Sequence, residues 1–152
     1  MKRILVLFIV ISLLPFCSTK KASTSADYVV FSLRKTECKG KCPVYYMEIF
    51  KSGKAVFEGK KNTDKIGSYT RQIDKSIIEK LIVDFNQAGF FGFHDEYTSK
   101  ITDLPSTYIS FRNNGTSKTI RDYAAAPNEL KRLEKLIEQF VDEAGWEKDD
   151  IK

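Results

Sequence analysis

A strand–strand–helix pattern occurs twice in the chain, and it constrains the fold more than any other feature. The helical segment 79–85 (EKLIVDF) is similar to the segment 134–140 (EKLIEQF), and each runs into Ala-Gly followed by an aromatic residue. Two alternating strands joined by a glycine turn precede each segment, at 44–50 and 55–60 and again at 106–112 and 116–123. The duplication predicts two hairpins, each followed by one helix.

Both predicted helices carry a single apolar stripe at three- and four-residue spacing. The first stripe consists of Ile77, Ile78, Leu81, Ile82 and Phe85, and the second of Leu130, Leu133, Ile137, Phe140 and Ala144. Gly89 and Gly145 follow as left-handed residues that end the helices. The residues therefore predict two amphipathic helices that each bury one side.

Two further strand patterns, at 28–33 and 68–73, complete the predicted fold class. We expect an α+β domain in which an antiparallel sheet of about six strands is covered on one face by two helices. Neither a parallel βαβ pattern nor a GxGxxG or Walker loop occurs in the sequence. A nucleotide-binding architecture is not expected, and neither is a nucleic-acid partner.

The N-terminal segment is typical of an export signal. Lys2 and Arg3 precede an unbroken apolar run of eleven residues, Ile4–Leu14. A transmembrane helix needs ~20 apolar residues, whereas a secretory signal needs ~7–15. The segment 14–17 (LPFC) resembles a bacterial lipobox, with Phe16 in place of the usual small residue. We expect a signal peptide over residues 1–16 and lipidation of Cys17, with plain secretion after cleavage near residue 26 as the alternative.

The rest of the chain divides into a tether, one domain and a tail. Residues 17–26 are expected to form a lipid-anchored flexible tether, 27–146 a single α+β domain and 147–152 a C-terminal tail. Residues 27–73 contain ten basic and five acidic side chains, net +5, and residues 74–152 contain eleven and fifteen, net −4. We expect the membrane, through the anchor, and an anionic envelope component or a protein as partners. Solvated strand faces with edge-protecting lysines are the alternative explanation of the basic half.

In the body of the chain, Cys38–Pro43 (CKGKCP) is the short motif whose residue types and spacing most strongly indicate a specific role. In an extended strand the Cα atoms of Cys38 and Cys42 would lie ~13 Å apart, beyond the ~7 Å that a disulfide tolerates, so a bond requires a turn. With Cys17 lipidated, two thiols remain in an oxidising compartment, which favours a structural disulfide. The spacing also resembles the copper-binding motif of Sco-type copper chaperones. A metal site with His94 as third ligand and a catalytic dithiol therefore stay open.

The connection between the two repeats, residues 92–105, is longer than usual and rich in possible ligands. A cation or a polar ligand can bind there, or the acidic residues can form turn hydrogen bonds while the tyrosine packs over the sheet edge. A single histidine without a nucleophile assembles no reaction, so we expect no enzyme, no catalytic residue and no cofactor. The candidate ligand residues are His94, Asp95, Glu96, Tyr97 and Asp103.

Three segments together resemble a known family. They are 38–45 (CKGKCPVY), 95–105, which begins with DEYT and ends with TDLP, and 122–127 (DYAAAP). They are similar to an uncharacterised domain of exported bacterial proteins with a Cys-x-Gly-x-Cys-Pro-x-Tyr motif, over about residues 29–144; Ala125 stands where that family is expected to have glycine. The resemblance implies location and extent but no catalytic role. The sequence thus predicts an exported lipoprotein with a non-enzymatic domain that binds or supports something in the envelope. A copper-binding or thiol-redox protein that uses Cys38 and Cys42 is the alternative.

Overall fold

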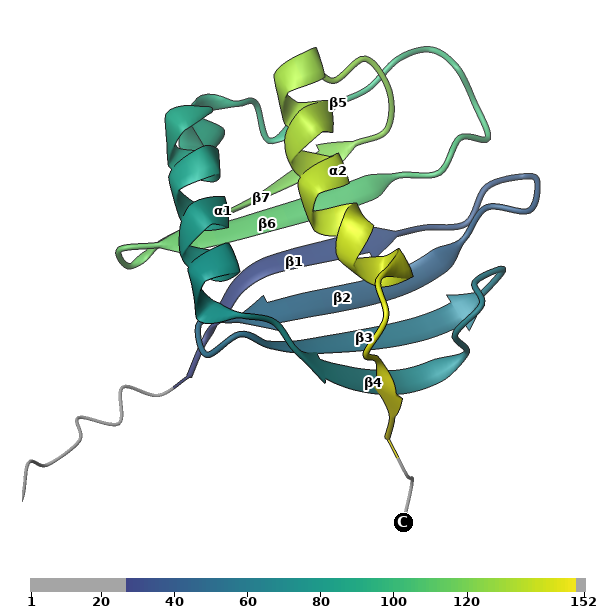
Figure 1. Cartoon of the computed structure of the whole chain (residues 1–152). Helices are drawn as coiled ribbons and strands as arrows, with labels where there is room; N and C mark the ends of the chain where they lie inside the picture. Colours follow the sequence, from purple (N-terminus) through teal and green to yellow (C-terminus); the bar gives the residue numbers. More distant parts are fainter. Residues whose placement is uncertain (1–26, 150–152) are drawn as a thin grey trace, which may run out of the picture.

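The computed structural model describes residues 27–149, so the predicted signal peptide, Cys17 and the tether up to Ala26 lie outside the described residues. Eleven elements follow one another in this range (Figure 1). They are β1 (Val29–Lys35), β2 (Val44–Phe50), β3 (Lys54–Lys61), β4 (Gly67–Gln72), α1 (Lys75–Gln87), the short 3₁₀ helix η1 (Phe90–Gly92), β5 (Glu96–Tyr97), β6 (Thr107–Asn113), β7 (Thr116–Asp122), α2 (Asn128–Asp142) and β8 (Glu147–Lys148).

All eight strands form one sheet in the order β5-β7-β6-β1-β2-β3-β4-β8, and both helices lie across the same face (Figure 1). The α+β class is therefore confirmed. The expected six antiparallel strands are wrong in detail, because the sheet has eight strands and is mixed, with β5 parallel to β7. The additional strands β5 and β8 have two residues each and lie at the two edges. A two-residue strand is too short to show the period of two from which strands are predicted.

The sequence duplication does not produce a repeated unit in space. β2 and β6 both run antiparallel to β1, yet β3 lies on the far side of β2 and β7 on the far side of β6. The two hairpins therefore extend from β1 in opposite directions, and no rotation superposes them with both helices on the same face. Each helix also extends across the sheet to strands on the other side of β1. Phe85 of α1 packs on Phe31 and Phe111 of β1 and β6, whereas Glu143 at the end of α2 pairs with Arg71 of β4.

The core lies between the helices and the face of the sheet that they cover. β1 is its centre, since Phe31 and Leu33 are fully buried between β2 and β6. The rings of Phe31, Phe85, Phe90 and Phe111 pack within about 6 Å of one another. The apolar stripes of both helices pack into this core, with one exception in each stripe. Ile77 of α1 is 41% exposed, and Ala144 lies beyond the last residue of α2.

The C-terminal part of the chain is fastened to the first half by polar contacts. Lys65 donates to the carbonyl of Val141 (2.8 Å), and the hydroxyl of Thr70 donates to Asp149 Oδ1 (3.1 Å). The positive φ angle of Gly89, directly after the C-cap Ala88, confirms the predicted end of α1. The predicted end of α2 at Gly145 is wrong, because α2 ends at Asp142 and Glu143 is already extended. Residues 147 and 148 of the predicted tail pair with β4 as β8. Some of the basic residues of the first half and acidic residues of the second half pair with each other inside the domain, in ion pairs between the sheet and the C-terminal part of α2 and its cap.

Among residues 27–149, no helix combines the length and the apolar character that a membrane span requires.

Candidate functional site

The three segments that carry the family resemblance meet at one end of the sheet. β1 ends there at Lys35, β6 begins there at Thr107, and β7 ends there at Asp122. The amide of Lys39 in the cysteine loop donates to the carbonyl of Asp103 (3.3 Å). The amide of Leu104 in turn donates to the hydroxyl of Tyr123 (3.2 Å). These bonds join residues that are 64 and 19 positions apart in sequence, and they tie the segments into one cluster, which we call the motif end.

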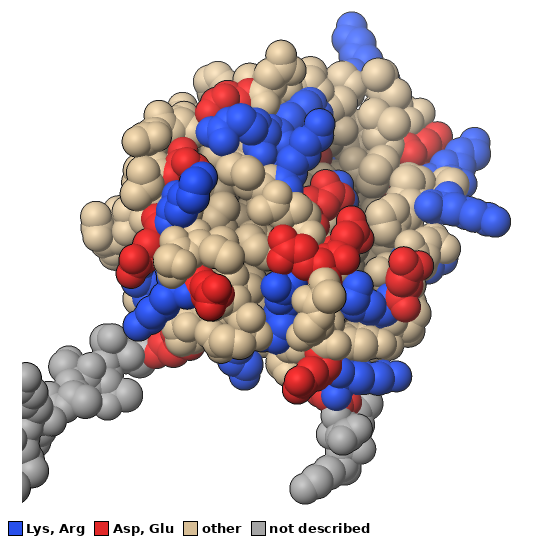
Figure 2. Space-filling view, in the orientation of Figure 1, with Lys and Arg blue, Asp and Glu red and all other residues tan. Residues whose placement is uncertain are grey.

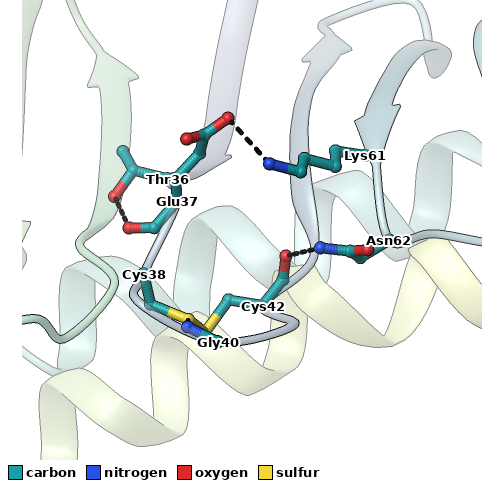
Figure 3. Close-up of polar contacts among 7 residues, drawn as sticks. All are labelled: Thr36, Glu37, Cys38, Gly40, Cys42, Lys61 and Asn62. Atoms are coloured by element: carbon teal, nitrogen blue, oxygen red, sulfur yellow. Dashed lines mark hydrogen bonds and ion pairs between the residues drawn. A yellow bond between two sulfur atoms is a disulfide. The ribbon is translucent and has the colours of Figure 1, made fainter.

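The cysteine loop closes one side of the motif end (Figure 3). Cys38 and Cys42 are disulfide-bonded, with an S–S distance of 1.92 Å and 5.8 Å between their Cα atoms, so the segment turns as a bond requires. The amide of Gly40 donates to the Sγ of Cys38 (3.2 Å), and the side chain of Asn62 donates to the carbonyl of Cys42 (3.0 Å). The bond and these contacts hold the loop against the turn that follows β3.

A cavity of about 280 Å³ lies between α2 and the two segments that precede β6 and follow β7. Loop residues Leu104 and Pro105 form its rim together with Tyr123. Charged side chains of both signs form most of its wall; they are Lys35, Asp122, Lys131, Glu134, Lys135 and Glu138. The face of the molecule that bears the helices shows the same intermixed acidic and basic groups (Figure 2).

Two carboxylates in this wall are buried and only partly satisfied. Asp122 is 6% exposed and Glu134 is 7% exposed. One oxygen of Asp122, Oδ2, pairs with the ammonium of Lys131 at 3.0 Å. Within residues 27–149, Asp122 Oδ1 and Glu134 Oε1 are buried without a hydrogen-bond partner. A buried acceptor without a donor costs free energy, so a donor supplied by a bound molecule would stabilise both oxygens.

The ionisation of Glu134 is perturbed by this environment. Burial raises the pKa of its carboxyl from 4.5 to about 7, and the nearby charge of Asp122 adds to the increase. Lys131 and Lys35 oppose it, and Glu138 adds to it weakly. Glu134 therefore exchanges its proton near neutral pH, unlike an ordinary surface glutamate.

A second set of contacts links the cysteine motif to α2. Tyr45, the tyrosine of that motif, is 3% exposed, and its hydroxyl donates to Glu138 Oε1 (3.3 Å). The same carboxylate pairs with the ammonium of Lys35 at 2.7 Å. Burial, followed by the charge of Glu138, raises the pKa of the Tyr45 phenol. The tyrosine thus serves as a neutral hydrogen-bond donor that anchors α2 over β2.

The candidate ligand loop is not gathered into one site. His94 lies edge-on to the ring of Tyr97, and its amide donates to the hydroxyl of that tyrosine (3.1 Å). Asp95 pairs with Lys118 at 2.9 Å, and Glu96 pairs with Arg121, both from β7. Tyr97 packs against the core, as the alternative interpretation predicts. Only Asp103 reaches the motif end, where it contributes its backbone carbonyl.

Sequence reasoning missed Glu134, although a signal was present. Glu134 lies four positions after Leu130 and three before Ile137, which places its side chain on the buried stripe of α2. A charged residue at a core position of a helix is uncommon and indicates a specific partner or a function. The predicted stripe contains only the apolar residues and leaves out the acidic residue among them.

The face of the sheet opposite the helices has a hollow of its own, of about 450 Å³. The guanidinium carbon of Arg34 lies 3.9 Å from the centre of the Tyr108 ring, a cation–π contact. Arg34 forms no ion pair within the described part of the chain. Hydroxyls of Ser32, Ser110 and Thr119 line the same hollow, as do Glu58 and Lys60, which pair with each other. This hollow suits a group with negative charge or acceptor oxygens.

The metal alternative depends on His94 joining the two cysteines. In the part of the chain from 27 to 149, no group of three or more His, Cys, Asp or Glu side chains is placed to hold a metal ion. His94 lies beside β5, at Tyr97, and the sulfurs of Cys38 and Cys42 are bonded to each other.

Ala125, between β7 and α2, has a φ of +67°, a left-handed conformation that favours glycine. We expect Ala125→Gly to raise the free energy of unfolding by up to about 1 kcal/mol, because relief of the backbone strain exceeds the entropy that glycine adds to the unfolded chain. The neighbouring Ala126→Gly is the control. It removes a buried methyl group and should lower the free energy of unfolding. Urea denaturation measures both, and equal losses for the two variants would contradict the strain argument.

The chain matches one described protein family over most of its length. No curated protein matches it. The family match runs over residues 29–141, from the first residue of β1 to the next-to-last residue of α2, and so includes the motif end and its cavity. The chain belongs to the family described as domain of unknown function DUF6438.

Proposed function

We propose that this chain is an exported lipoprotein whose DUF6438 domain binds a small ligand at the motif end, without catalysis, in the cell envelope. One observation carries the binding proposal. Two of the three motif segments, at 104–105 and 122–123, line a cavity together with α2, and two buried carboxylate oxygens in its wall have no partner within residues 27–149. A domain selected for stability alone would satisfy or remove such groups, since each unpaired buried acceptor costs about 1–3 kcal/mol.

The export part of the proposal rests on the N-terminal sequence. The basic residues, the apolar run and Cys17 follow one another in the order of a lipoprotein signal. A disulfide in a domain with two cysteines suits an oxidising compartment. In this setting the lipid chain is the membrane partner, and the hollow around Arg34 is the surface that suits an anionic envelope component.

Binding at the motif end predicts thermal stabilisation that depends on the cavity. In a melting screen of the mature protein against amines, sugars, organic acids and short peptides, at least one compound should raise the melting temperature, because a ligand of the native state stabilises it. Leu104→Trp places a large ring at the cavity rim and should abolish the shift. Tyr46→Phe, in the hollow of the opposite face, should keep it. A shift that persists in Leu104→Trp would mean that the ligand site lies elsewhere.

Lipidation at Cys17 predicts a covalent label. Cells grown with a fatty-acid analogue should label the wild-type protein, and Cys17→Ser should lose the label because the acceptor thiol is gone. Cys38→Ser is the matched control and should remain labelled, since its thiol lies in the body of the domain. Equal labelling of wild type and Cys17→Ser, or a mature N-terminus at Asp27, would reject the anchor.

A thiol-redox or copper function is the second candidate, favoured by the half-buried position of both cysteines in a surface loop. We expect the exported protein to contain no free thiol at Cys38 and Cys42 when it is alkylated without reductant and weighed by intact mass spectrometry. Prior reduction should add two alkyl groups. Two reactive thiols without reductant, or stoichiometric copper that is lost in His94→Ala, would favour this second function instead.

A further inference from the structure

The cavity at the motif end has the chemistry of an ammonium site. Asp122 Oδ1 and Glu134 Oε1 are acceptors, and neither has a donor among residues 27–149. Both residues are more than nine-tenths buried, and both line the same cavity. A partner for them must carry hydrogen-bond donors and preferably positive charge.

The protein's own lysines supply only some of the hydrogen-bond donors that these two carboxylates need. Lys131 pairs with Asp122 through Oδ2 and leaves Oδ1 free. Lys35 is held by Glu138 at 2.7 Å, so its ammonium is directed to a different carboxylate. Each of the two acidic residues therefore has a buried oxygen without a donor, and Lys131 and Lys35 are already paired with other oxygens.

A metal ion is a poorer partner for this arrangement than an organic cation. Ca²⁺ takes six to eight oxygen ligands, and the part of the chain from 27 to 149 has no group of three acidic, histidine or cysteine side chains arranged for a metal. An ammonium group brings three donors and needs only a few acceptors. The rim residues Leu104 and Pro105 offer apolar contact for the carbon skeleton that carries it.

We propose that the motif-end cavity binds the primary ammonium group of a small organic molecule between Asp122 and Glu134. This inference rests on the proposed binding function and names its ligand class. Amino sugars and the free amino groups of peptides are two envelope sources of the same chemistry.

Proton release accompanies binding in this arrangement. The groups that face Glu134 are Asp122 from β7, Lys35 from β1, and Lys131 and Glu138 from its own helix; Tyr123, whose hydroxyl already accepts a hydrogen bond from Leu104, lies at the rim. An ammonium ion binds the ionised carboxylate better than the neutral acid, so it lowers the pKa of Glu134 from its free value of about 7. Affinity for an amine should therefore increase as the pH rises through 7 and level off above it.

Calorimetric titration of the mature protein with three small probes tests the ligand class. Ethanolamine, ethylene glycol and glycolate have the same size and one hydroxyl in common, but their second group is cationic, neutral or anionic. We expect ethanolamine alone to bind. Its affinity should fall about tenfold from pH 8 to pH 6, as a single carboxyl with a pKa of about 7 requires.

Variants of α2 provide the matched comparison. Glu134→Gln keeps the shape of the side chain and removes its charge; it should weaken ethanolamine binding at least tenfold at pH 8 and flatten the dependence on pH. Glu129→Gln changes an exposed glutamate that pairs with Arg132 on the same helix, and it should bind like the wild type. Melting curves of both variants establish that the domain is folded.

Matched amide pairs distinguish the two sources. Glucosamine is compared with N-acetylglucosamine, and alaninamide with N-acetylalaninamide. The free amine that binds more tightly, glucosamine or alaninamide, identifies the ligand as an amino sugar or a peptide. Equal binding of ethylene glycol or of both acetylated compounds would overturn the ammonium proposal while leaving the cavity as the ligand site. Binding of Ca²⁺ in preference to every amine, or no heat with any amine at pH 8, would overturn it as well. A melting shift that survives Leu104→Trp instead contradicts the proposed function itself.

Discussion

The sheet depends on the two hydrogen-bonded ladders of β1. This strand pairs with β2 on one side and β6 on the other, and within the described residues it is the only strand that pairs with both hairpins. Its side chains Phe31 and Leu33 are fully buried, and Phe31 contacts the aromatic rings of both α1 and β6. Each hairpin alone would have one helix and half a core. Because β1 supplies the shared wall, the two halves form one hydrophobic core.

The central position of β1 also creates the motif end. The chain leaves β1 directly into the cysteine loop, and the segments before β6 and after β7 arrive at the same end because β6 is antiparallel to β1 and β7 to β6. Three stretches that are distant in sequence are thereby brought together, and hydrogen bonds from Lys39 and Leu104 fix them. The charge difference between the halves supports this assembly, since Glu138 of α2 receives both Lys35 and Tyr45 from the sheet.

The hairpins, the two helices and the end of α1 were predictable because each produces a local pattern. The alternation in β2 and β6, the stripe of α2 and the glycine after α1 depend only on neighbours in sequence. The edge strands β5 and β8 were missed because two residues carry no period. The opposite arrangement of the two hairpins was not predictable either, since sequence similarity does not specify on which side of β2 or β6 a partner strand pairs. The role of Glu134 in the candidate site could be identified only from the fold, because its unpaired oxygen becomes apparent only when Asp122 and the cavity are placed beside it.

The direction of β1 determines which way the cavity faces on an anchored chain. The strand begins at Val29, close to the point where the tether enters the domain and where Asp27 binds Ser52 at the opposite end of the sheet from the cysteine loop (Figure 1). Seven residues at ~3.3 Å each separate that point from the motif end by ~20 Å. A domain held by its N-terminus would thus have its cavity at the end of the sheet opposite the point of attachment, where the attachment itself does not cover it.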